Sequence, residues 1–119
     1  MSRITPAIRD RLRADVSAAR AARRSGDHAL SWELLEGAHV LSQPWAVWHV
    51  RVHGSMLLAG AREGDIREVA GQLVRLSIAG PGTVSGRYPV GNTGRARVPA
   101  TQPMPIRGDL AELLREAGR

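Results

Sequence analysis

Four stretches of this chain carry apolar residues three or four positions apart, and a short turn signal follows each of the first three. This spacing places the apolar side chains on one side of an α-helix. The turn signals combine glycine, proline and helix-capping residues at 25–27, 42–44 and 64–65. Such short connections join antiparallel neighbours, so we expect two helical hairpins. The expected helices span residues 6–24, 29–41, 45–62 and 66–79.

The remainder of the chain has a different character. Glycine and proline are dense over residues 80–107, and we expect the run at 80–82 to end the fourth helix at residue 79. Apolar residues between them favour an extended strap that lies against the helices. A short helix at 108–118 follows, capped by Asp109. The predicted fold is all-α: one domain of residues 1–119, with a helical core at 5–79, a strap at 80–107 and a terminal helix at 108–118.

The helical spacing also predicts which residues of the fourth helix are buried. The residues expected to face inward are Ile66, Val69, Ala70, Leu73 and Leu76.

The composition excludes several classes of protein. The chain has no cysteine, so it has no disulfide, thiolate metal site or cysteine nucleophile. The net charge is +6 and all 17 basic residues are arginines, but they are spread along the whole chain without a nucleic-acid-binding motif. This distribution argues against nucleic acid as a partner. Because no apolar run is long enough for a membrane span and no secretory signal is recognisable, we expect a cytoplasmic protein without membrane contact.

Three of the four histidines lie close together in the sequence, on either side of the turn at 42–44. Glu36 and His39 form an E-x-x-H pair before it, and His49 and His53 form an H-x-x-x-H pair after it. Residues four apart share a helix face, so a hairpin should bring these side chains to a similar depth. Neutral imidazole suits zinc, copper, nickel and iron. The sequence therefore predicts a divalent transition-metal site in which His39, His49 and His53 are ligands and Glu36 is the fourth.

The same histidines have a second interpretation, as polar residues of a helical core that bind backbone carbonyls or neighbouring side chains. The chain would then be an interaction module that holds a protein partner or a second copy of itself. No catalytic arrangement of Ser, His and Asp or of paired carboxylates stands out, so an enzyme is not favoured. The candidate residues of a partner or anion-binding surface are Trp32, Trp45, Trp48, Arg51, Asn92 and Arg95.

Two resemblances to known families depend on particular residues. Residues 26–38, followed by Pro44, resemble the second helix of a tetratricopeptide-type repeat. That resemblance covers about 19–80 and implies stacked hairpins without any ligand, although the offset between the two turns exceeds the usual period of about 34 residues. Over nearly its full length the chain also resembles a small, uncharacterised bacterial family. The residues that carry this likeness are 36–39, 49–53, 89–95 and 104–106. It implies no established activity and slightly favours metal handling or resistance.

Overall fold

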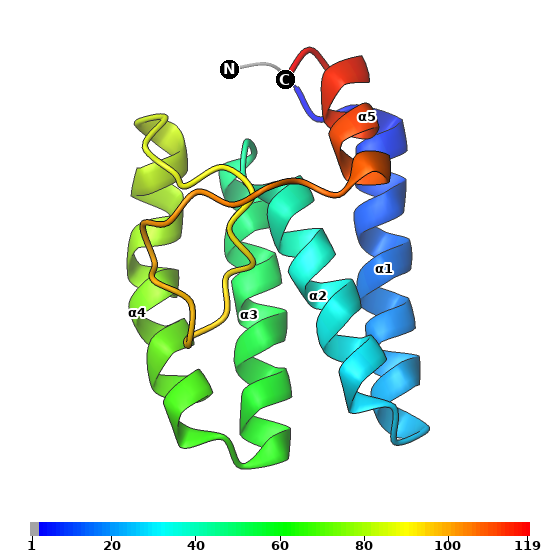
Figure 1. Ribbon diagram of the computed structural model, residues 1–119, viewed down its shortest axis with the longest axis vertical. Helices are drawn as coiled ribbons and strands as arrows, with labels where there is room; N and C mark the ends of the chain where they lie inside the picture. Colours follow the sequence, from blue (N-terminus) through cyan, green and yellow to red (C-terminus); the bar gives the residue numbers. More distant parts are fainter. Residues whose placement is uncertain (1–2) are drawn as a thin grey trace.

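The computed structural model describes residues 3–119. The helices are α1 (Pro6–Arg24), α2 (His28–Ser42), α3 (Ala46–Glu63), α4 (Ile66–Val84) and α5 (Gly108–Glu116). α1 and α2 form one hairpin, α3 and α4 form a second, and α5 packs on α1 and α2 (Figure 1). The described residues contain no strand. The all-α fold built from two helical hairpins is confirmed.

The turns form where the sequence places helix-capping residues. The side chain of Thr5 accepts from the N–H of Ile8 at 3.3 Å, and Pro6 follows it as the first residue of α1. Asp27 and Asp65 cap α2 and α4 in the same way, each accepting a backbone N–H three residues later at 3.0 Å. Gly64 ends α3 with φ at +69°, a conformation that glycine adopts without a steric penalty.

The hydrophobic core lies between α1, α2, α3 and α5. It consists of aliphatic side chains together with two tryptophans, Trp32 and Trp45, rather than of phenylalanine, which the chain lacks. α5 closes one end of the core with two leucines. Its larger aliphatic members include Ile8, Leu12, Leu35, Leu41, Val52, Met56, Leu110 and Leu114. Among the described residues, no helix is long and apolar enough to cross a membrane.

The fourth helix does not end at residue 79, as the sequence indicated, but continues through Pro81 to Val84. Pro81 costs the helix one backbone hydrogen bond, because it has no N–H to donate. The extra turn is held by Thr83, whose buried hydroxyl donates to the carbonyl of Gln43 at 3.0 Å. Gly86, with φ at +72°, follows the end of the helix. The irregular strap therefore begins at residue 85 rather than at residue 80.

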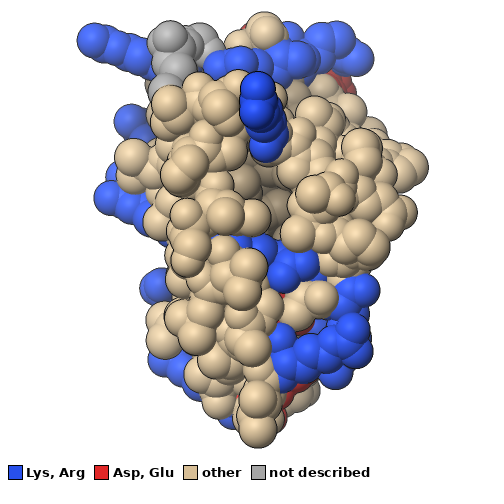
Figure 2. Space-filling model, turned by 90° about the vertical axis from the view of Figure 1, so that its left-hand side faces the viewer, with Lys and Arg blue, Asp and Glu red and all other residues tan. Residues whose placement is uncertain are grey.

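The fourth helix also buries a different face from the one expected. Ile66 is 84 % exposed, Leu73 is 54 % exposed and Ala70 is exposed, although all three were predicted to face inward. Val69 and Leu76, predicted in the same way, are half-buried. The residues that α4 buries are mostly polar: Glu68, Gln72, Arg75, Ala79 and Thr83. Seen from the α4 side, the surface is mostly uncharged, with arginines along its edges (Figure 2). The exposed side chains of α4 include Leu73, Val74 and Ile78. Exposed apolar residues on one face are typical of an interaction surface, and a protein partner or homodimer stays a prediction.

The strap, residues 85–107, explains why α4 turns its polar face inward. It leaves the end of α4, runs down beside α3 and α4, and returns across the bundle to α5 (Figure 1). Gln43 anchors it twice, because its Nε2 donates to Pro89 O at 2.8 Å and its Oε1 accepts the N–H of Gly91 at 3.0 Å. The backbone of the strap pairs only some of its own N–H and C=O groups, so its other buried carbonyls need polar side chains opposite them. α4 supplies such side chains.

Candidate metal centre

Three histidines converge at the junction of the two hairpins. His39 lies on α2, and His49 and His53 lie one turn apart on α3. All three are buried. The Nε2 atom of His39 lies 3.0 Å from that of His53 and 3.1 Å from that of His49. One ligand atom from each ring lies within 4.8 Å of the other two, so the predicted convergence of the three imidazoles is confirmed.

The opposite nitrogen of each ring binds an oxygen of the surrounding protein. His39 Nδ1 lies 2.6 Å from the carbonyl of Asn92 in the strap. His49 Nδ1 lies 2.8 Å from Thr83 Oγ1 on α4. His53 Nδ1 lies 2.6 Å from Gln72 Oε1, also on α4.

These contacts determine which nitrogen carries the proton in each neutral ring. The Asn92 carbonyl can only accept, so His39 must donate to it from Nδ1. The hydroxyl of Thr83 uses its only proton on the Gln43 carbonyl and is left as an acceptor for His49.

The amide of Gln72 is oriented in the same way by its neighbours. Its Nε2 donates to Glu68 Oε2 at 2.9 Å and to Gly94 O at 2.8 Å, which turns its oxygen toward His53. All three rings therefore carry their proton on Nδ1 and present an unprotonated Nε2 to the common point.

Burial keeps these rings neutral. The pKa of His49 falls to about 4, because the charged form is desolvated and because His53 lies beside it. Burial also lowers the pKa of His53, and it holds the pKa of His39 well below its ordinary value, with His53 and His49 adding to the effect. Neutral imidazole is the form that binds a metal ion.

The structure does not bring Glu36 to this cluster. Its carboxylate is turned toward the strap, where it lies 3.9 Å from Arg95 Nη1. Burial raises the pKa of Glu36. Glu36 was expected at the cluster because the 100° step between helical residues places it on a face next to that of His39. The carboxylate lies instead beside Arg95 of the strap, and the sequence did not predict the course of that segment.

Glu68 is the acidic residue that supports the cluster, and the sequence analysis missed it. Its side chain is fully buried and accepts from Gln72 Nε2, from the N–H of Ala96 at 2.9 Å and from Arg95 Nε. The carboxylate thus reaches His53 only through the amide of Gln72. Glu68, Gln72 and Arg75 are four and three positions apart, so they share one face of the helix. This spacing could have indicated a buried polar stripe.

The other predicted surface residues have separate surroundings. Asn92 belongs to the cluster through its backbone carbonyl, and its amide nitrogen donates to two strap carbonyls. Arg95 stacks on Trp32 with its guanidinium carbon 3.6 Å from the ring centroid. Arg51 lies 5.2 Å from the ring of Trp48. Trp45 is buried in the core. These residues do not form one continuous surface.

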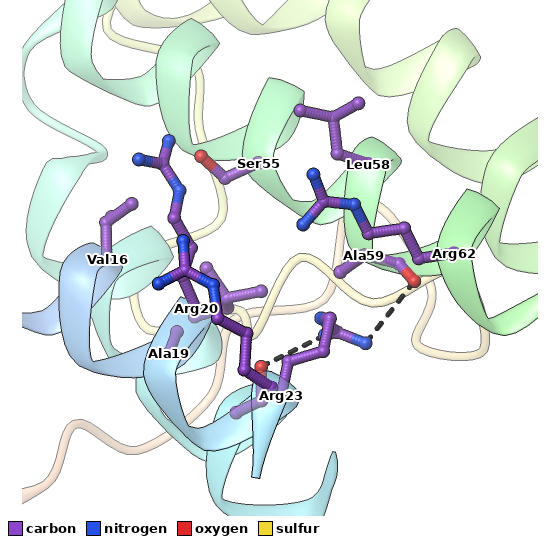
Figure 3. A pocket seen from close by; sticks show the side chains of 11 residues that line it. Val16, Ala19, Arg20, Arg23, Ser55, Leu58, Ala59 and Arg62 are labelled. Carbon is purple, nitrogen blue, oxygen red and sulfur yellow. Dashed lines mark hydrogen bonds between the residues drawn. The ribbon is translucent and has the colours of Figure 1, made fainter. Parts of the chain in front are cut away.

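A separate hollow of about 200 Å³ lies between α1, α2 and α3. Arg20 and Arg62 extend over it, while Arg23 crosses its base and donates to Ser31 Oγ and Ala59 O (Figure 3). None of the clustered histidines lines this hollow. It is therefore a second depression, independent of the candidate metal centre.

The family comparison agrees with the resemblance expected from the sequence. The model of a family described as a protein of unknown function, DUF3703, matches residues 6–114. The chain belongs to this family. The match includes all three clustered histidines and their partners on α4 and in the strap. No curated protein and no solved structure matches the chain.

Proposed function

We propose that this protein binds a single divalent transition-metal ion through the Nε2 atoms of His39, His49 and His53. The observation that supports the proposal is the convergence of three lone pairs with no proton between them. Each ring already donates its only N–H to an oxygen on its far side. The lone pair of His39 Nε2 faces those of two nitrogen atoms 3.0 and 3.1 Å away and is repelled by them, and a cation between the three rings would replace this repulsion by bonds to all three.

The distances suit such an ion. With metal–nitrogen bonds of about 2.0–2.1 Å, two nitrogens separated by 3.0–3.1 Å subtend an angle of roughly 95° at the metal. This value lies between the octahedral and tetrahedral angles. Metal-bound imidazole usually donates its other N–H to a protein oxygen, which fixes the ring and strengthens the ligand. All three rings meet that condition. An all-imidazole ligand set favours zinc, copper, nickel or iron over magnesium and calcium, which prefer oxygen.

The test is metal content together with metal-dependent stability. The purified protein, without an affinity tag, is analysed for bound elements, stripped with a chelator, and titrated with Zn²⁺, Cu²⁺ and Ni²⁺ while thermal unfolding is followed. An ion at one hundred times its Kd should stabilise the folded state by about 2.7 kcal/mol. For a chain of this length, that gain corresponds to an increase in Tm of roughly 10 °C.

Two histidine variants make the test specific. His49→Gln removes one ligand and should abolish the metal-dependent increase in Tm. His28→Gln is the matched control, because the side chain of His28 is 55 % exposed and lies beside Glu63, outside the cluster. The proposal fails when no metal co-purifies and the melting curves are flat for all three ions. It also fails when His28→Gln and His49→Gln lose the effect equally.

A further inference from the structure

A small cavity opens beside the three histidines. Its volume is about 120 Å³, which is room for a few water molecules or one small anion. The strap, α2, α3 and α4 all contribute to its walls. The lining includes His39, His49, His53, Arg75, Tyr88 and Thr101. Three ligands leave a divalent transition metal with at least one open position, and this cavity is the space beside the ligands.

Arg75 is an unusual member of this lining. It is 9 % exposed, and its guanidinium donates to Gly71 O at 3.1 Å and to Val98 O at 2.8 Å. Among the described residues, no carboxylate forms an ion pair with it. Two backbone carbonyls satisfy part of its hydrogen-bonding capacity but carry no formal charge, and a buried cation without a directly paired carboxylate is costly.

The nearby acidic group, Glu68, offsets the charge of Arg75 only in part, because the effect of burial on the pKa of Arg75 exceeds that of this carboxylate. The carboxylate of Glu68 is engaged by Arg95 and by the N–H of Ala96. Glu36 is turned toward Arg95 as well. A metal dication on three neutral imidazoles would therefore lie beside a second buried cation. The protein supplies no anionic ligand to the metal, and the one buried carboxylate nearby, that of Glu68, is shared with Arg95.

We infer that the open position of the metal takes a small inorganic anion, which bridges the ion and the guanidinium of Arg75. This inference depends on the proposed function, since the anion needs the metal as its first partner. The free N–H groups of a guanidinium are strong donors to a bound anion. The resulting site has three imidazoles on one side of the metal and an anion on the other, in a cavity of about 120 Å³.

The experiment uses the Co²⁺-loaded protein, because the visible absorption of Co²⁺ reports its ligands. Azide is the probe anion, added at constant ionic strength. Binding to the metal should change the visible spectrum with saturation, and the infrared stretch of azide should shift from its free value in parallel. The infrared measurement needs no variant. A Co²⁺ spectrum that azide leaves unchanged overturns the inference while the proposed function stands. Failure of Co²⁺ and the other ions to bind overturns both.

Variants at the cavity test the role of Arg75. Arg75→Met should raise the Kd for azide at least tenfold while the protein still takes up Co²⁺, and Arg75→Lys should keep the Kd within about threefold because it retains a cation. Arg87→Met is the matched control: Arg87 also lines the cavity but is exposed, so water screens its charge. Equal azide affinities for Arg75→Met and Arg87→Met would contradict the assignment of Arg75. Circular dichroism verifies that each variant is folded.

Discussion

A threonine at the end of α4 determines which nitrogen of His49 carries the proton and which one faces the other two imidazoles. Thr83 donates its hydroxyl proton to Gln43 O and accepts from His49 Nδ1. A side chain without a hydroxyl would leave the His49 ring free to turn or to place its proton on Nε2, inside the cluster. The chemistry of the centre thus depends on single hydrogen bonds beyond the ligands.

Thr83→Val tests this dependence with little change in side-chain volume. We expect a loss of metal affinity of roughly 10- to 100-fold, the range typical when a ligating histidine loses its oxygen partner. Thr83→Ser keeps the hydroxyl and should bind within about threefold of the original chain. Competition with a chromophoric chelator measures both affinities. Equal weakening in the valine and serine variants would show that packing, rather than the hydrogen bond, matters at this position.

A glycine of the strap lies directly against the site. Gly94 has φ at +82°, and a Cβ atom there would lie 2.6 Å from Cδ2 of His39. Gly94→Ala should therefore displace the His39 ring and lower both stability and metal affinity. Gly86→Ala is a matched control, because Gly86 has φ at +72° but no neighbouring atom within 4 Å of a Cβ. Both variants bear the cost of a left-handed alanine, roughly 1–2 kcal/mol. In calorimetric titrations, only Gly94→Ala should also lose metal affinity.

At the scale of elements, α4 shows what the sequence could and could not predict. The helices, their turns and the three converging histidines follow from local spacing, because apolar periodicity, capping residues and the i, i+4 relation are all short-range. The buried face of α4 does not follow. Periodicity predicts which residues share a face of the helix, but the segment that packs against the helix determines which face is buried. For Gln72 that segment is the strap, which has no periodicity of its own.

The packing of α4 against the strap leads to a prediction about two helical glycines. A Cβ at Gly71 would overlap the side chain of Ala96, which has no flexible end to move away. Gly71→Ala should therefore destabilise the protein by roughly 1–3 kcal/mol, as overpacking does. Gly54→Ala should stabilise it by roughly 0.5–1 kcal/mol, because no atom lies within 4 Å of a Cβ there and alanine favours the helix. Urea unfolding compares the two. Changes of the same sign would contradict the role of Gly71 as a contact with the strap.

At the scale of the whole molecule, the candidate centre lies where the two helical hairpins and the strap come together. Its imidazoles come from α2 in the first hairpin and α3 in the second, and their oxygen partners come from α4 and the strap. α5 has no residue at the centre and packs on α1 and α2 at one end of the bundle. A bound ion would therefore stabilise one side of the molecule against local opening more than the other.

Hydrogen exchange can measure this asymmetry. An opening that separates the strap from α4 breaks the contacts that orient His39 and His53, so the open state should bind the ion more weakly. At one hundred times the metal Kd, amides of the strap that exchange by this route should slow by roughly 10- to 100-fold, and the upper value applies when the open state does not bind the ion. Amides of α5 that exchange by fraying of that helix should keep their rates, because fraying leaves the three imidazoles in place.

Equal slowing in α5 and the strap would mean that both exchange only through global unfolding. Unchanged rates in both would mean that the ion does not join the strap to the bundle.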